Sequence, residues 1–91
     1  MTDPADRYAL TFRPAALRAL RKLDRQIAER IKVATEALRD DPRPPGATML
    51  TGSQGLWRIR IGDYRVVYAV DHQRRIVRVA AAGHRRDVYT R

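Results

Sequence analysis

Residues 56–68 read LWRIRIGDYRVVY and predict two β-strands joined by a tight turn, because apolar and polar side chains alternate on both sides of Gly62-Asp63. Glycine followed by aspartate suits the primed turn of a two-residue hairpin. This turn sets the register of the strands, so one face is expected to be buried. That face carries three apolar or aromatic pairs: Ile61 with Tyr64, Ile59 with Val66, and Trp57 with Tyr68.

The opposite face of the predicted hairpin is rich in arginine. The same register sets Arg60 directly across from Arg65, and Arg58 across from Val67. Like charges that face each other across a β-ladder destabilise it. A small domain that keeps such a pair is expected to use this face to bind a polyanion.

The overall charge agrees with that interpretation. The chain has 91 residues, with 19 lysines and arginines against 10 acidic residues, for a formal net charge of +9. Residues 56–91 contain nine arginines and three aspartates, so the excess charge lies on the predicted sheet. A positive charge concentrated in this way favours binding to nucleic acid or anionic surfaces. The length suits one modest core, and we expect a single domain over residues 1–91.

Composition also excludes several classes of function. The chain has no cysteine, which rules out a disulfide framework, a thiol nucleophile and a thiolate metal site. With only His72 and His84, in different kinds of segment, we expect no metal and no other cofactor. No apolar run reaches the length of a membrane span, and the N-terminus lacks a signal-peptide core. The expectation is a soluble cytoplasmic protein that binds no membrane.

Two helices are predicted before the hairpin. Residues 8–13 alternate as a short strand, and Pro14 suits the first position of a helix. Asp24 is the expected N-cap of a second, longer helix that ends before Pro42. The first helix is expected to bury Leu17, Leu20 and Leu23, and the second Ile27, Ile31, Ala34 and Leu38.

The rest of the chain predicts a loop and a third strand. Residues 42–55 form the loop, with Met49 and Leu50 expected to anchor it on the core. Residues 76–82 form the strand; if Val70 pairs with Arg75, its apolar residues Val77, Val79 and Ala81 oppose Tyr68, Val66 and Tyr64.

That register places Arg78 beside Val67, in the row of Arg58, and returns residues 83–89 to the Gly62-Asp63 turn. The predicted fold class is therefore α+β: an N-terminal strand, two helices, then a three-stranded antiparallel meander with both helices on one face.

This order of elements, residues 56–68 and the ending GHRRDVY at residues 83–89 resemble the RelE branch of the RelE/ParE toxin superfamily. The resemblance covers nearly the whole chain. It implies a toxin of a type II toxin–antitoxin system that cuts messenger RNA in the ribosomal A site without metal. Its implied partners are the ribosome, the messenger and a cognate antitoxin. We expect the antitoxin to bind across the basic face or the adjoining helices, or to displace the terminal segment.

The resemblance also assigns roles to residues. It implies catalytic positions at Arg58, Arg60, Arg65, Arg85 and Tyr89. Arginine forks suit phosphate oxygens and can stabilise the charge that develops when the 2′-hydroxyl attacks. Tyr89 is the candidate base, since surrounding guanidinium groups favour a phenolate. Arg85 would sit by the leaving group, with His84 as an alternative acid.

Further basic residues are expected to contact RNA: Arg78, His84 and Arg86. One departure from the family pattern is Met49, where a basic residue often precedes the leucine. Two alternatives stay open at this point. The chain could resemble the ParE branch, which acts on DNA gyrase, or it could be a non-catalytic module that binds nucleic acid or antitoxin.

Overall fold

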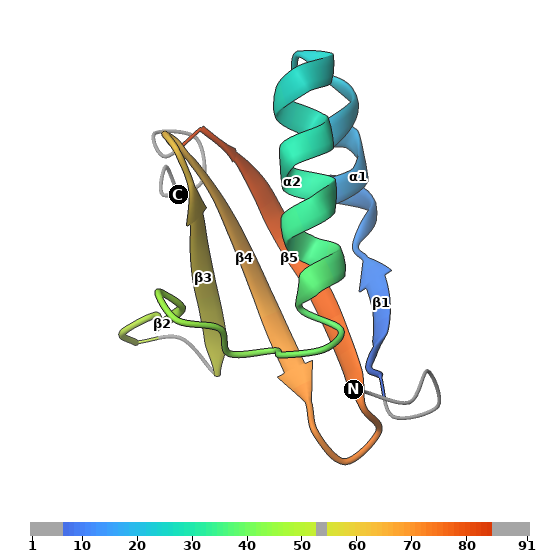
Figure 1. Ribbon diagram of the computed structural model, residues 1–91, viewed down its shortest axis with the longest axis vertical. Helices are drawn as coiled ribbons and strands as arrows, with labels where there is room; N and C mark the ends of the chain where they lie inside the picture. The colour runs from blue at the N-terminus through green and yellow to red at the C-terminus, as the bar shows by residue number, and fades with distance from the viewer. Residues whose placement is uncertain (1–6, 53–54, 85–91) are drawn as a thin grey trace.

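A computed structural model describes residues 7–52 and 55–84, which form one mixed sheet with two helices on one face (Figure 1). The sheet order is β1-β5-β4-β3-β2. In chain order the elements are β1 (Ala9–Phe12), α1 (Pro14–Arg21), α2 (Arg25–Ala37), β2 (Thr48–Met49), β3 (Leu56–Ile61), β4 (Tyr64–Asp71) and β5 (Ile76–His84).

The central hairpin has the predicted register. β3 and β4 are antiparallel, and Ile61 pairs with Tyr64 across the Gly62-Asp63 turn. Gly62 has a φ of 62°, a conformation that glycine adopts without steric cost. The apolar face is buried as expected, because Ile59 is 8% exposed and Val66 is fully buried. The local turn chemistry was sufficient to predict this part of the sheet.

The predicted register between β4 and β5 was wrong. Asp71 pairs with Ile76, because the Asp71 carboxylate accepts a hydrogen bond from the Arg74 N–H (3.0 Å) and the turn therefore starts one residue later than expected. Val77 consequently pairs with Val70 instead of Tyr68, and Arg78 pairs with Ala69 instead of Val67.

A β-bulge then changes the faces of β5. Tyr68 pairs with Val79 but Val67 pairs with Ala81, so Ala80 is an extra residue on this strand. An extra residue reverses the alternation of side chains beyond it. Ala82 (6% exposed) therefore joins the core in place of Ala81, which the sequence alternation had placed there.

The expected three-stranded meander is the middle of a larger sheet. β1 lies parallel to β5 at one edge, and β2 lies antiparallel to β3 at the other. β2 is too short to predict from alternation. Met49, expected on the core, is instead 54% exposed in β2. The next residue, Leu50, continues the contact with β3 by donating its N–H to the Leu56 carbonyl (2.9 Å).

The helices cover the apolar face, and α1 packs mainly on β5 (Figure 1). Pro14 opens α1, and the Asp24 carboxylate accepts from the Gln26 N–H (3.1 Å) to cap α2, both as predicted. Ile31 is fully buried, as is Leu38 just past α2. In α1 the buried residue is Ala16, while Leu17, expected in the core, is 39% exposed; this short helix turns only a narrow stripe toward the sheet.

The segment after α2 is tied to the core by one buried phenol. The Tyr68 hydroxyl donates to the Pro42 carbonyl at 2.6 Å, and the ring is fully buried. Burial raises the pKa of Tyr68 to about 12, with a further rise from the negative charge of Asp41 and an opposing effect of Arg43. At neutral pH this hydroxyl therefore keeps its proton and remains a donor.

Candidate nucleic-acid interface

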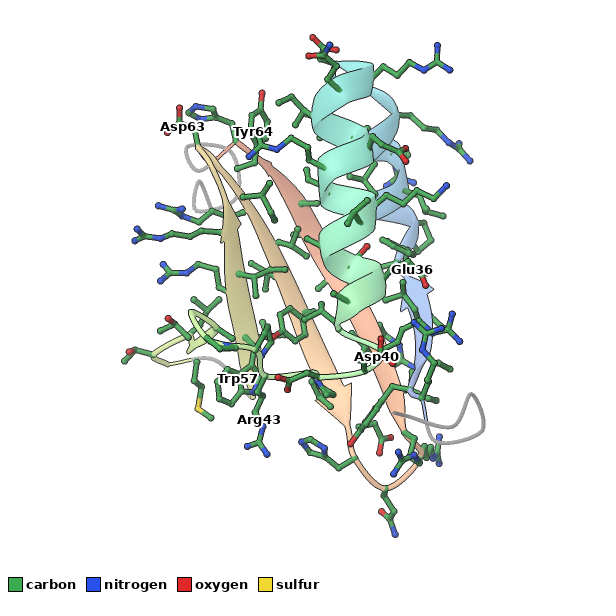
Figure 2. All side chains as sticks on the ribbon, in the orientation of Figure 1. Glu36, Asp40, Arg43, Trp57, Asp63 and Tyr64 are labelled. Atoms are coloured by element: carbon green, nitrogen blue, oxygen red, sulfur yellow. The ribbon has the colours of Figure 1, made fainter. Side chains whose placement is uncertain are left out.

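The face of the sheet that turns away from the helices, here called the outer face, carries the arginines of the hairpin. Arg60 and Arg65 are directly opposed across β3 and β4, and Arg58 pairs with Val67 one row further along. Figure 2 shows nitrogen-tipped side chains leaving β3 on the side away from the helices. The two adjacent rows thus place these three arginines on one face of the sheet, as the hairpin register predicted.

These three arginines differ in exposure. Arg60 is exposed, Arg58 is half-buried, and Arg65 is only 7% exposed. The Nε atoms of Arg58 and Arg65 are buried, so the stems of both side chains lie along the protein surface. Burial restricts the conformations of a long side chain. Arg65 is therefore held in place at the centre of the cluster, and Arg60 is the freely accessible cation beside it.

The residue on the other side of Arg65 is Gly83 of β5. Glycine adds no side chain to this row, and Gly83 itself is buried. The row Arg60–Arg65–Gly83 therefore sets two guanidinium-bearing residues side by side, with no side chain from β5 between them. Two adjacent arginines suit a phosphate.

Ion pairs of the described residues lie at the other end of the molecule from this row. Arg7 pairs with Asp40 (2.9 Å), Arg39 with Glu36 (3.3 Å), and Arg74 with Asp71 (4.0 Å). Glu36 and Asp40 are far from the turn that carries Asp63 and Tyr64 (Figure 2). Within residues 7–52 and 55–84, no carboxylate forms an ion pair with Arg60, which leaves its charge available to a ligand.

The other candidates fall in different places. Arg78 is exposed on the outer face but lies across from Ala69, one row beyond Arg58 and two strands away from it. His84 pairs with Tyr64, and the two rings meet edge to face with centroids 5.6 Å apart. Because Tyr64 is on the helix-covered face, His84 is there too, and the structure separates it from the arginine cluster. Arg85, Arg86 and Tyr89 lie outside the described residues.

Two cationic contacts were not anticipated. The Arg30 guanidinium of α2 lies over the β3–β4 turn, with Nη2 3.8 Å from the position that a Cβ on Gly62 would occupy. At the other end of β3, the Arg43 guanidinium stacks over the Trp57 ring at 5.7 Å. Both contacts join residues far apart in the chain, so periodicity within a segment carries no signal for them.

Two classes of feature are absent from the described part of the chain. In residues 7–52 and 55–84, no three side chains of the metal-binding types gather in one place. Over the same ranges, neither helix has the length and apolar character needed to cross a membrane.

Together, the fold and this surface define a small α+β domain that presents a basic sheet face and covers the other face with two helices. A family profile described as the ParE toxin of the type II toxin–antitoxin system parDE matches residues 10–89. A RelE-like toxin protein of Escherichia coli is 33% identical over 87 residues, covering 91% of this chain and 90% of the relative. The chain therefore belongs to the RelE/ParE superfamily of type II toxin–antitoxin toxins.

Solved structures support the same assignment. The isolated RelE toxin of Escherichia coli is 30% identical with a TM-score of 0.75, covering 91% of this chain and 92% of that chain. The RelBE2 toxin–antitoxin complex of Mycobacterium tuberculosis contains a chain that is 26% identical with a TM-score of 0.78, covering 87% of this chain and 99% of that one.

Proposed function

We propose that this toxin is a ribosome-dependent endoribonuclease that cleaves messenger RNA in the A site. The observation that carries the proposal is the pair Arg60–Arg65, because it combines a cation fixed by burial with an accessible cation directly opposite it on one sheet face. A phosphate that gains negative charge during the reaction benefits from both.

The proposed reaction is an internal transesterification. The 2′-hydroxyl loses its proton to the Tyr89 phenolate, and the 2′-oxygen attacks the neighbouring phosphorus. The bond to the 5′-oxygen breaks, leaving a 2′,3′-cyclic phosphate and a 5′-hydroxyl. Arg60 and Arg65 stabilise the charge on the phosphoryl oxygens, and Arg58 positions the same phosphate from the next row.

The leaving 5′-oxygen must gain a proton as it departs. Arg85 is the residue proposed beside it, where a guanidinium neutralises the charge while a water supplies the proton, since arginine does not readily give up its own. His84 was the alternative acid. His84 lies on the helix-covered face against Tyr64, which argues against this role for it.

A cognate antitoxin is the second proposed partner. RelE chains of the solved relatives occur in toxin–antitoxin complexes, including that of Mycobacterium tuberculosis. The charge that attracts RNA also attracts an acidic polypeptide, so an antitoxin that covers the outer face would block the messenger directly.

Primer extension on translated messages tests the proposal. Cells that express the toxin are expected to show cuts within codons, and the Arg60→Ala and Arg65→Ala variants are each expected to cut about 100-fold less, as when one donor is removed from a charge-stabilising site. Arg74→Ala is the matched control, because Arg74 is exposed at the opposite end of the sheet. Unchanged cutting by the Arg60 and Arg65 variants would place the reaction elsewhere.

Inhibition of DNA gyrase is the second candidate function. The observation that favours it is the match to the ParE profile over residues 10–89. A supercoiling assay with purified gyrase separates the two candidates. Inhibition of supercoiling together with intact messages would support the ParE activity, whereas neither effect would indicate a binding module that has lost its activity.

A further inference from the structure

A small pocket opens on the helix-covered side of the sheet, at the end that carries the β3–β4 turn. Its volume is about 280 Å³, and it lies between the C-terminal end of α1 and the adjoining ends of β4 and β5. Lys22 and Leu23 contribute from the helix side, and Tyr64, Ala82 and His84 from the strands. Ligand pockets for small molecules start near about 300 Å³, so this one is at the small end of that range.

The chemistry of the lining combines two rings with a cation. Tyr64 and His84 meet edge to face at an interplanar angle of 82°, and both side chains are half-buried, so each ring reaches the pocket surface. Unpaired bases are commonly recognised by stacking on tyrosine or histidine rings. The rings thus provide a surface for a base.

Lys22 supplies the charge. A lysine at the end of a helix is ordinary, because it complements the helix dipole. Here its side chain also lines the pocket, and within residues 7–52 and 55–84 it forms no ion pair with a carboxylate. The ammonium group is therefore available to a phosphate.

The pocket is directly across the sheet from the arginine row. Tyr64 precedes Arg65 on β4, and His84 follows Gly83 on β5. Neighbouring residues of a strand point to opposite faces. A flexible RNA chain whose phosphate lies at Arg65 therefore has to pass only the ends of β4 and β5 to bring its next nucleotide to the pocket.

We propose that this pocket binds one unpaired nucleotide of the RNA, with its base against Tyr64 and His84 and its phosphate at Lys22. The proposal rests on the proposed function for the identity of the RNA as a messenger. It assigns the pocket the role of holding a nucleotide next to the cleaved bond, so that base identity at this position influences which codons are cut.

The composition of the chain makes a direct binding test possible. There are only two histidines and two lysines, and one of each lies outside the pocket: His72 in the β4–β5 turn and Lys32 on the exposed side of α2. In an NMR titration of the full chain with adenosine 5′-monophosphate, we expect the ring signals of His84 and the side-chain signals of Lys22 to shift. The signals of His72 and Lys32 should stay in place and serve as internal controls.

Variants separate the two parts of the ligand. Lys22→Gln is expected to weaken nucleotide binding about 10-fold, the loss of one charge-assisted hydrogen bond, while Lys32→Gln leaves it unchanged. Ala19→Leu, which places a larger side chain at another lining position, is expected to abolish the His84 shift with Lys22 intact. Inorganic phosphate should bind much more weakly than the nucleotide; equal shifts with phosphate would overturn the role of the base.

The outcomes distinguish this inference from the proposed function. Shifts confined to Arg58, Arg60 and Arg65, or no shift at all, would overturn the pocket assignment even if the toxin cleaves messages. The toxin could fail to cleave RNA while the signals of His84 and Lys22 still respond to the nucleotide. That result would support the pocket assignment and overturn the nuclease proposal. If both hold, Lys22→Gln is expected to keep cleavage but change the distribution of codons that are cut.

Discussion

The two faces of the sheet are built by the same strands but differ in what they contribute. The helix-covered face holds fully buried residues such as Val66, Tyr68 and Val79, and packs against Ile31 of α2. The outer face opposes Arg60 to Arg65, one residue pair away from the hairpin turn. One face therefore stabilises the fold, whereas the other carries a charge arrangement that opposes it.

The contrast shows how a chain of this size accommodates a binding surface. Burial on one side stabilises the strands enough to tolerate repulsion on the other. The two faces do not differ simply in being buried or exposed, since Arg65 and Val67 of the outer face are nearly as buried as the core. The outer face thus holds Arg65 fixed by burial, with the exposed Arg60 beside it.

The largest stability effect is expected on the covered face. Ile31→Ala removes a fully buried side chain, and we expect it to lower the free energy of unfolding by about 2–5 kcal/mol, measured by urea denaturation. Val33→Ala on the same helix is the control, because Val33 is 62% exposed and should change stability by less than about 0.5 kcal/mol. Similar effects of the two substitutions would mean that the faces do not differ as described.

A smaller effect on stability is expected from removing the Tyr68 hydroxyl, which holds the segment after α2 through Pro42. Tyr68→Phe removes the bond to the Pro42 carbonyl and should cost about 1 kcal/mol at neutral pH. The variant should also respond differently to alkali. The raised pKa of about 12 means that the folded state favours the protonated phenol, so this stabilisation is complete below about pH 10 and is lost as pH rises toward 12.

The alkaline response can be read from denaturation at several pH values. The parent chain should lose about 1 kcal/mol through this group by about pH 11, and Tyr68→Phe should lack that part of the decline. Parallel pH profiles for the two proteins would contradict the assigned cause of the pKa shift.

The smallest effect, and the one of opposite sign, is expected on the outer face. Arg60→Gln keeps most of the side-chain length but removes the charge that faces Arg65, so the free energy of unfolding should rise by about 0.2–1 kcal/mol in low salt. The gain should shrink as salt screens the repulsion. Arg74→Gln at the far end of the sheet serves as the control, and a destabilised Arg60→Gln protein would show that Arg60 supports the fold.

How well the sequence predicted each element depended on how local its determinants are. The β3–β4 register follows from a two-residue turn, and the start of each helix follows from Pro14 and Asp24; all were predicted. The parallel pairing of β1 with β5 joins segments more than 60 residues apart, and a two-residue β2 has no period to detect. These features depend on packing of the whole chain.

The candidate site divides in the same way. By itself, the sequence determined that Arg58, Arg60 and Arg65 share a face, because alternation and a tight turn act over a few residues. Only the tertiary structure decided the position of His84. Without the extra residue at Ala80, alternation would have placed His84 among the arginines; the bulge turns it to the helix side, beside Tyr64 and Lys22. A bulge depends on how β5 packs against β4 and the helices, and no local pattern in the sequence records it.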